Sequence, residues 1–287
     1  MKKSVVITGV STGIGYGSTK EFIHKGYHVF GSVRKREDAV KLKNEFGTAF
    51  TPLIFDITDE KAIHEAAKLV GEILNGNGLT GLINNAGAAE AGPLMHMPVD
   101  IFRRHLEILV IGQLIVIQAF LPLLGADKNS SSPPGKIINI SSINGKIPAP
   151  FMGGYVAAKH ALEGLSKTLR IELQLYGIDV ITVGPGIIKT TIWEKAEENT
   201  FEQYRNTIYF EPYQLFAAVV RKMIKTDGME LDNFSKKLVK VFERKNIRTR
   251  YAILKNRFTG WILPQILPAR LLDKFYAEIM KVRHPKN

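Results

Sequence analysis

The stretch that decides the fold is Thr8-Gly9-Val10-Ser11-Thr12-Gly13-Ile14-Gly15, which follows a short apolar run and opens a helical pattern. Its glycines allow a tight turn and let a pyrophosphate approach the backbone, while the helix start offers N–H groups and the positive end of its dipole. A glycine cluster alone is equally typical of a structural turn. Its place between a strand and a helix predicts a dinucleotide-binding loop.

Apolar runs rich in β-branched residues alternate with helical patterns beyond this loop. The runs are residues 5–8, 29–33, 49–55, 79–84, 137–141 and 180–183, and the helical patterns are 15–25, 38–45, 60–73, 101–124 and 154–176. This alternation predicts an α/β fold, a Rossmann-type doubly wound parallel sheet with a C-terminal helical extension. We expect residues 1–191 to form the dinucleotide-binding and catalytic part. Residues 192–287 would add a substrate lid and a basic extension of the same domain.

Composition excludes several classes of protein and site. Hydrophobic residues make up 45% of the chain and charged residues 23%, as in ordinary globular proteins. No residue is a cysteine, which excludes disulfides, thiolate metal ligands and cysteine nucleophiles; we expect no metal site and a cytoplasmic protein. The uncharged stretch 108–126 is nearly long enough to span a bilayer, but Gln113, Gln118 and Pro122 interrupt it. We interpret it as a buried or subunit-facing helix.

The positive charge lies in the last quarter of the chain. The formal net charge is +12, and residues 221–287 contain 17 Lys and Arg against 6 Asp and Glu. A basic tail on a nearly neutral body favours an added role, such as attraction to a membrane surface. A nucleic-acid binder is the weaker hypothesis, because the tail carries no recognisable motif and its charges alternate with apolar residues. We therefore expect no specific nucleic acid.

The end of the second predicted strand bears on which cofactor binds. An acidic residue there would hydrogen-bond a ribose 2′-hydroxyl, whereas an arginine would accept a 2′-phosphate. Val33 takes the acidic position and Arg34 follows it, with Lys35 and Arg36 next. This pattern favours NADP over NAD; the alternative is that Arg34 is an ordinary solvated surface charge.

Tyr155-Val156-Ala157-Ala158-Lys159 lies in a helical pattern and carries the proposed acid–base chemistry. Residues four apart share a helix face, so the Lys159 ammonium would lower the pKa of the Tyr155 phenol from about 10 towards neutral pH. This spacing alone is common in ordinary helices. Ser142 lies thirteen residues upstream, just past a predicted strand.

These segments together resemble the short-chain dehydrogenase/reductase superfamily over residues 4–191. The glycine pattern matches the T-G-x-x-x-G-I-G of that family, Asn84-Asn85-Ala86-Gly87 matches its next landmark, and Pro185-Gly186-Ile187-Ile188-Lys189-Thr190 matches its P-G-x-x-x-T. The resemblance implies that Ser142 holds a carbonyl oxygen, Tyr155 exchanges a proton with it, and Lys159 also holds the nicotinamide ribose. The cofactor-binding residues that it implies are Thr8, Gly9, Ser11, Thr12, Gly13, Ile14, Gly15, Arg34, Asp56, Ile57, Asn85, Ala86, Gly87, Tyr155, Lys159, Pro185, Gly186, Ile188 and Thr190.

Leu109 departs from the family pattern. The family usually has an asparagine three residues before the glycine of its fourth helix, here Gly112, and that asparagine anchors a water linked to the lysine. Leu109 cannot bind a water, so either the proton relay takes another route or turnover is slow. A catalytically weak, cofactor-bound regulatory or scaffold protein is therefore the alternative to an efficient enzyme.

The last third of the chain bears on substrate and partners. The tail, with Arg250-Tyr251 and the 262–272 segment, resembles the steroid- and retinol-dehydrogenase-like branch, which implies a hydrophobic alcohol and its ketone or aldehyde as substrates. An apolar lid, or alternatively core packing, is expected of Ile192, Trp193, Phe201, Tyr204, Ile208, Tyr209 and Phe210. The aromatic 258–269 segment with basic flanks would contact a membrane surface, the substrate pocket or a second subunit. By resemblance, helices 101–124 and 154–176 would form a homodimer or homotetramer interface.

Overall fold

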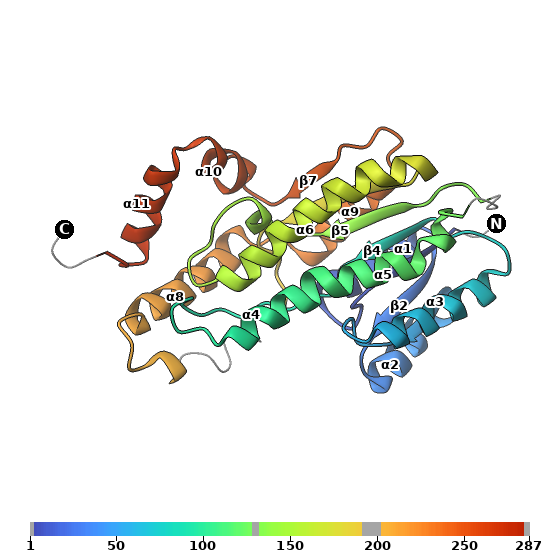
Figure 1. Ribbon diagram of the computed structural model, residues 1–287, viewed down its shortest axis with the longest axis horizontal. Coiled ribbons are helices and arrows are strands. Elements are labelled where there is room, and N and C mark those ends of the chain that lie inside the picture. The colour runs from blue at the N-terminus through green and yellow to red at the C-terminus, as the bar shows by residue number, and fades with distance from the viewer. Residues whose placement is uncertain (1–2, 128–131, 191–201, 284–287) are drawn as a thin grey trace.

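The computed structural model describes residues 3–127, 132–190 and 202–283, which form a parallel sheet with helices on both faces (Figure 1). Seven strands lie in the order β3-β2-β1-β4-β5-β6-β7. They are β1 Ser4–Ile7, β2 His28–Val33, β3 Phe50–Ile54, β4 Gly81–Asn84, β5 Lys136–Ile140, β6 Asp179–Pro185 and β7 Arg250–Ile253. The strand order reverses between β1 and β4, as in a doubly wound sheet, and the predicted fold class is confirmed.

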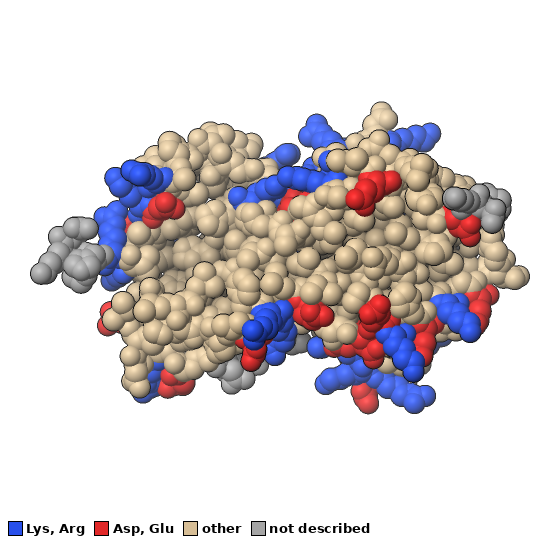
Figure 2. Space-filling model, viewed as in Figure 1, with Lys and Arg blue, Asp and Glu red and all other residues tan. Residues whose placement is uncertain are grey.

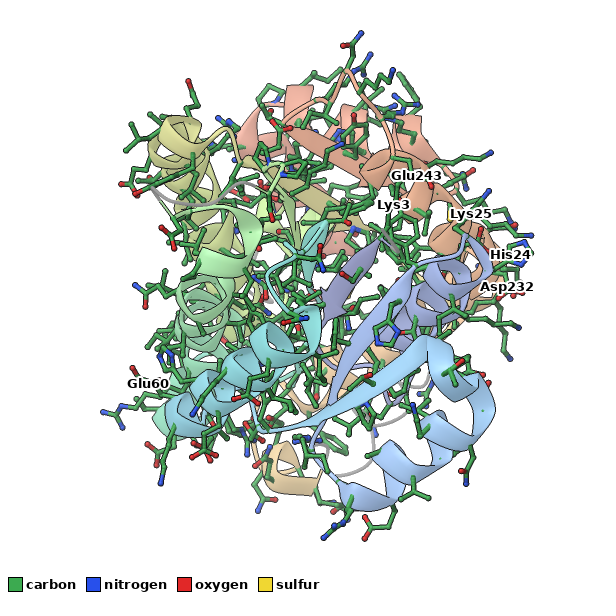
Figure 3. The ribbon with its side chains drawn as sticks, turned by 90° about the vertical axis from the view of Figure 1, so that its right-hand side faces the viewer. Lys3, His24, Lys25, Glu60, Asp232 and Glu243 are labelled. Carbon is green, nitrogen blue, oxygen red and sulfur yellow. The ribbon has the colours of Figure 1, made fainter. Side chains whose placement is uncertain are left out.

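Two layers of helices cover the sheet. The helices are α1 Gly13–His24, α2 Arg36–Phe46, α3 Glu60–Leu74, α4 Val99–Leu106, α5 Gly112–Phe120, α6 Gly153–Glu172, α8 Phe210–Asp227, α9 Leu231–Phe242, α10 Leu263–Ile266 and α11 Ala269–Ile279. Helices α1, α2 and α9 pack on one face of the sheet, and α3, α5 and α6 pack on the other. Figure 3 shows this from the side: His24 and Lys25 at the end of α1 and Asp232 of α9 lie on one side of the sheet, whereas Glu60 of α3 lies on the other.

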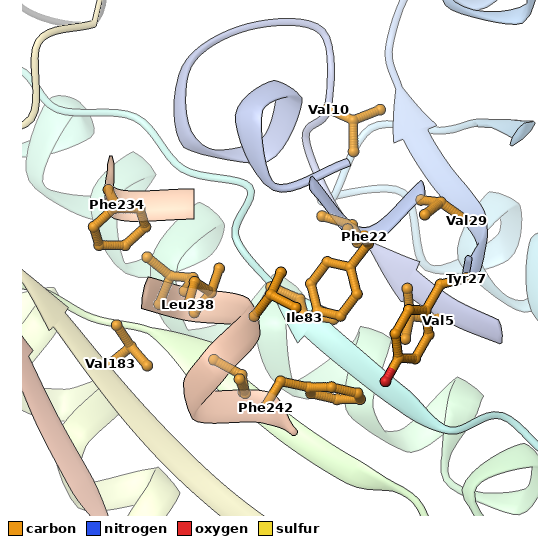
Figure 4. Packing of buried hydrophobic residues seen from close by; sticks show 14 of the residues in the cluster. Val5, Val10, Phe22, Tyr27, Val29, Ile83, Val183, Phe234, Leu238 and Phe242 are labelled. Atoms are coloured by element: carbon orange, nitrogen blue, oxygen red, sulfur yellow. The ribbon is translucent and has the colours of Figure 1, made fainter. Parts of the chain in front are cut away.

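Aromatic side chains join the α1–α9 layer to the sheet. Phe22 of α1 is fully buried and contacts the rings of Tyr27 and Phe242 edge to face, each with 5.2 Å between ring centres (Figure 4). Val5 and Ile83 of the central strands belong to the same cluster. Full burial of such side chains stabilises the fold by about 1.5–3 kcal/mol each. This packing holds α1, and with it the glycine-rich loop, against the sheet.

The predicted helix over 101–124 is helical from Val99 to Phe120, with an irregularity that the sequence analysis did not predict. A π-type turn at Glu107–Ile111 separates α4 from α5, and a 3₁₀ turn at Pro122–Leu124 follows α5. Val116, Ile117 and Phe120 of α5 are fully buried against the sheet, which confirms a buried helix rather than a membrane span. Among the residues that the structure describes, no helix is long and apolar enough to cross a membrane.

The C-terminal third contributes to the main fold, and the sequence analysis missed this. Strand β7 pairs with β6 in parallel, with Val183 opposite Tyr251, and α9 packs against α1. The apolar part of this strand, 251–253, is short and follows Arg248, Thr249 and Arg250, so its signal was too weak to predict a strand. Helices α10 and α11 extend beyond the sheet as an arm at one end of the molecule (Figure 1).

Candidate active site

The segments singled out in the sequence meet at the carboxyl edge of the parallel sheet. The glycine-rich loop follows β1, Arg34 follows β2, and Asp56 comes after β3. The Asn85–Gly87 segment follows β4, Ser142 follows β5, and the 186–190 segment follows β6. Ligands of open α/β sheets bind outside this edge, at the point where the strand order reverses. Parallel strands thus bring together residues that are up to about 180 positions apart.

Glycines at three positions of the loop after β1 are required by its shape. Gly9 and Gly13 have positive φ angles of 69° and 59°, which other residues rarely adopt. A Cβ atom on Gly15 would lie 2.1 Å from the Gly9 carbonyl oxygen and 2.6 Å from Nδ2 of Asn85. The loop is therefore tightly folded, and a pyrophosphate group can come close to its backbone N–H groups at the start of α1.

Thr8 and Asn85 join the loop after β1 to the segment after β4. The Thr8 hydroxyl accepts hydrogen bonds from the backbone N–H groups of Asn85 and Ala86, both at 2.9 Å. The Asn85 side-chain amide donates to the carbonyls of Thr8, at 2.9 Å, and Gly9, at 3.1 Å. These bonds give Thr8 and Asn85 a structural role in their two motifs, because they fix the backbone that a cofactor would contact.

The segment after β6 closes the site from the other side. Thr190 lies beside Gly13, because a Cβ atom on that glycine would be 3.7 Å from the Thr190 side chain. The Gly186 N–H donates to the Ile253 carbonyl at 3.0 Å, and Ile188 is buried and forms a bridge with Met229. The predicted 185–190 segment therefore faces the loop after β1.

The end of β2 offers a cation and no carboxylate of its own. Val33 is buried, and the Arg34 side chain is 77% exposed, with its Nη1 3.9 Å from Oδ2 of Asp56. Asp56 in turn accepts hydrogen bonds from the Thr58 backbone and hydroxyl. A loosely held, exposed guanidinium fits a ribose 2′-phosphate, whereas a ribose hydroxyl would need an acceptor at position 33.

Ser142, Tyr155 and Lys159 converge at the end of β5. The Ser142 hydroxyl acts on the Tyr155 phenol, whose pKa it tends to lower, and accepts the Asn144 N–H at 3.1 Å. Lys159 is almost fully buried; its Nζ lies 5.7 Å from the centre of the Tyr155 ring and donates to the Ile140 carbonyl at 2.8 Å. A phenol, a hydroxyl and an amine within one cluster can hold a carbonyl oxygen and deliver a proton to it.

The pKa values of this cluster correct one expectation. Burial raises the pKa of Tyr155 above its ordinary value of 10, and the hydrogen bond from Ser142 opposes this only in part. Burial also lowers the pKa of Lys159 to about 7, while the carboxylate of Glu163 acts to raise it. The prediction that the Lys159 ammonium lowers the pKa of Tyr155 is therefore wrong for this structure, because the buried ammonium is itself destabilised.

Buried polar residues to which the sequence analysis assigned no role join β4, β5, α5 and α6 beside the cluster. Asn84 donates through Nδ2 to Oδ1 of Asn139 at 3.0 Å, and Asn139 donates to the Ser166 hydroxyl at 2.9 Å. Gln113 donates to the Ala86 carbonyl at 2.7 Å. All four of these side chains are buried in the described structure. The only available signal was an asparagine within each of two buried strands.

The structure places Leu109 at the candidate site. Leu109 is buried in the π-type turn and lies against Gly87, so the departure from the family pattern lies beside the cofactor segment.

Tyr204 and Tyr209, two of the predicted lid residues, belong to an apolar cluster that packs against Tyr155, whereas Ile208 is 87% exposed and contributes nothing to a lid. Phe210 is half-buried at the start of α8. Ile192, Trp193 and Phe201 lie outside the described residues.

The family model of the short chain dehydrogenases matches residues 3–227. The chain belongs to this family. It is 36% identical over 278 residues to an NADPH-dependent 3-dehydrocapnine reductase of Ornithobacterium rhinotracheale, a match that covers 96% of this chain and 97% of the relative. It is 31% identical over 222 residues to estradiol 17-beta-dehydrogenase 2 of Mus musculus, covering 72% of this chain and 55% of that one. The resemblance to steroid dehydrogenases is thus confirmed for this short chain dehydrogenase.

Solved structures agree with the fold. The structure described as ElxO with NADP bound has a TM-score of 0.70 and 25% sequence identity. The similarity covers 88% of this short chain dehydrogenase and 97% of that chain. One relative is NADPH-dependent, another is a dehydrogenase, and the structural neighbour binds NADP. These properties agree with the residues found at the carboxyl edge of the sheet.

Proposed function

We propose that the protein is an NADP(H)-dependent oxidoreductase that interconverts a hydrophobic alcohol and its ketone or aldehyde, such as a steroid, a retinoid or a lipid-like compound. The observation that carries the proposal is the convergence of Ser142, Tyr155 and Lys159 beside the glycine-rich loop. This is the geometry that a hydride transfer to a carbonyl needs, because the oxygen must gain a proton as the carbon gains the hydride.

In the direction of reduction, bound NADPH would supply the hydride for the carbonyl carbon. The Ser142 hydroxyl would donate a hydrogen bond to the carbonyl oxygen and orient it. The Tyr155 phenol would transfer its proton to that oxygen as the alcohol forms, and its raised pKa keeps it protonated at neutral pH. Lys159 would bind the nicotinamide ribose. Oxidation of an alcohol reverses these proton and hydride transfers.

The choice of NADP rests on Arg34 and on the relatives. Arg34 is exposed at the end of β2 and Val33 provides no acceptor for a ribose hydroxyl. The 3-dehydrocapnine reductase is NADPH-dependent, and ElxO binds NADP. We expect Arg34→Glu to weaken NADPH binding about a hundredfold, because a charge-assisted contact to the phosphate becomes a repulsion. Fluorescence titration with NADPH and NADH measures this; equal loss for both cofactors would contradict the assignment.

A hydrophobic substrate is supported by the surroundings of Tyr155. The cluster packed against its ring consists of Ala91, Phe151, Met152, Tyr204, Tyr213 and Met280, with further apolar residues around them. These residues come from the segment after β4, the two positions before α6, the turn at Glu202–Tyr204, α8 and the position after α11. Among the relatives, one reduces 3-dehydrocapnine and another is an estradiol dehydrogenase. An apolar wall beside the proton donor favours substrates of this hydrophobic class.

The experiment follows NADPH oxidation with 3-dehydrocapnine, estrone, all-trans-retinal and 2-tridecanone. We expect turnover of at least one of them, and Tyr155→Phe is expected to lower kcat by about 10³-fold. The dissociation constant for NADPH, measured by fluorescence, should stay within a few-fold, since the phenol is only one of the many contacts that the resemblance implies for the cofactor. Tight NADPH binding without turnover in the wild-type protein would favour the regulatory or scaffold alternative instead.

Contact with a membrane surface is a second proposal, for the C-terminal arm. Phe258, Ile266 and Phe275 are between 57% and 68% exposed, and Arg270 and Lys274 lie among them in sequence. Exposed aromatic and aliphatic side chains with nearby cations suit an interface of anionic lipid. Co-sedimentation with phosphatidylserine vesicles at low salt tests this. No binding, or binding unchanged in Ile266→Ser with Phe275→Ser, would overturn it and leave only a cytoplasmic location.

A further inference from the structure

Arg250, from the strand that the sequence did not reveal, lies directly behind the catalytic cluster. Its Nε donates to both carboxylate oxygens of Glu163, at 2.9 and 3.1 Å, and its Nη2 donates to the backbone carbonyl of Ser142 at 3.0 Å. The two side chains are 16% and 3% exposed. Charge-assisted bonds of this kind are strong where water is excluded. One guanidinium therefore connects β7, α6 and the residue that would hold the carbonyl oxygen.

The surroundings of Arg250 are shaped to hold the guanidinium in one orientation. The Trp261 ring covers it, with 4.1 Å between Cζ and the ring centre. A Cβ atom on Gly184 of β6 would lie 2.5 Å from Nη2, so only glycine leaves room for the contact with Ser142. Stacking on an aromatic face and a fixed fork of donors are properties of arginine that lysine does not share.

Glu163 continues this connection to Lys159. The two residues are four apart in α6 and therefore share one face of the helix. The Glu163 carboxylate acts to raise the pKa of Lys159 against the effect of burial. The other cations that act within this cluster are Arg250, Lys146 after the 143–145 turn, and Lys167 of α6. Glu163 is thus paired directly with Arg250 and acts on the catalytic lysine through its charge.

We propose that Arg250 and Glu163 are positioning residues of the reaction, which tie the C-terminal strand to the Ser142 carbonyl and to the ammonium group of Lys159. The proposal rests on the proposed function, since it assigns Ser142 and Lys159 to catalysis. Arg250 neutralises part of the Glu163 charge, and Glu163 in turn supports the charge on Lys159. Neither residue touches the substrate or the cofactor in this proposal, and both act through the residues that do.

The test is a pH titration of Lys159 by NMR in protein labelled with ¹³C and ¹⁵N lysine, with the resonance assigned through Lys159→Met. The wild-type midpoint is expected near pH 7. Glu163→Gln removes the supporting carboxylate and should lower the midpoint by about one unit. Arg250→Gln removes a competing cation and should raise it. Arg248→Gln, two residues before Arg250 and outside the cluster, should leave it unchanged.

Opposite shifts in Glu163→Gln and Arg250→Gln are the result that supports the proposal. Shifts of the Lys159 midpoint in the same direction in both variants, or no shift in either, would overturn it. A purely structural role gives no reason for the two midpoints to move in opposite directions. The titration needs no substrate, so it remains informative even if the proposed reductase activity is absent.

Arg250→Lys provides a second measurement, which keeps the proposal testable if Arg250→Gln fails to fold. It retains the charge, but an ammonium cannot span both Glu163 and the Ser142 carbonyl. We expect kcat with NADPH and the carbonyl reduced by the wild-type protein to fall about tenfold, with an unchanged NADPH dissociation constant and Lys159 midpoint. An unchanged kcat would remove the positioning role for Ser142.

Discussion

Lys159 is a buried cation, and its burial affects stability as well as chemistry. The ammonium is exposed to water in the unfolded chain, where its pKa is near 10.5, whereas burial lowers the folded-state pKa to about 7. Below pH 7 the lysine is charged in both states, and the folded protein bears the full cost of desolvation. As the pH rises from 7 towards 10.5, the folded protein loses the proton first, so this cost declines.

Lys159→Met is therefore expected to raise the free energy of unfolding most below pH 7, with a gain that shrinks as the pH rises towards 10. Urea unfolding at several pH values measures the difference from the wild-type protein. Lys41→Met is the matched control, because that lysine is exposed on α2. A gain that grows with pH would show that Lys159 is not buried as a destabilised cation.

Leu109 offers a second test at the level of a single residue. Leu109→Asn places a polar amide beside Gly87, at the position where the family pattern implies an asparagine that anchors a water. We expect kcat to rise about tenfold, since the proton relay gains a polar link, while stability falls by about 1–3 kcal/mol because an amide is buried. Leu106→Asn, one turn earlier in α4, is the control for kcat. An unchanged kcat in Leu109→Asn would indicate a relay through the backbone.

At the scale of elements, the glycine-rich loop and the segment after β4 form one unit. The Asn85 side chain fixes the backbone of Thr8 and Gly9. The Gly9 carbonyl and the Asn85 amide leave no room for a side chain at Gly15. The loop is therefore shaped before any cofactor arrives, and its conformation depends on a strand that lies about 70 residues further along the chain. Stability and cofactor affinity should accordingly change together when this unit is disturbed.

Gly15→Ala is expected to lower the free energy of unfolding by about 1–3 kcal/mol, because the new Cβ would overlap the Gly9 carbonyl. It should also weaken NADPH binding, which fluorescence titration measures. Gly71→Ala in α3 is the control: the new Cβ would meet only the Leu123 side chain, at 3.4 Å, and the substitution favours helix by about 0.5–1 kcal/mol. Equal destabilisation by both would contradict the tight-loop argument.

At the scale of the whole molecule, one broad face carries few charges. Figure 2 shows that the surface over α4, α5 and α6 is largely uncharged, with Lys, Arg, Asp and Glu around its rim. Ile111 is 45% exposed, Ile171 of α6 is 65% exposed, and Leu175 in the turn after it is 82% exposed. Apolar side chains on an uncharged face are typical of a subunit interface. This agrees with the prediction of a homodimer or homotetramer.

Ile171→Glu is expected to convert an oligomer into monomers at micromolar concentration, because a charge would be buried in the interface. Light scattering coupled to size-exclusion chromatography measures the mass. Val40→Glu, at a comparably exposed site on α2 across the sheet, should leave the mass unchanged. A wild-type protein that is already monomeric at high micromolar concentration would remove the oligomer prediction.

The sequence alone determined the glycine-rich loop, the Ser142–Tyr155–Lys159 set and the doubly wound sheet. The loop and the sheet follow from local signals, which are glycines between a strand and a helix and buried strands that alternate with helices. The Ser142–Tyr155–Lys159 set followed from the resemblance to the short-chain dehydrogenases. Only the tertiary structure revealed the π-type turn beside Leu109, the place of β7, and the pairing of Arg250 with Glu163 across 87 positions. Such pairings depend on which distant segments the sheet brings side by side, and burial decides their pKa values; neither is encoded in a local pattern.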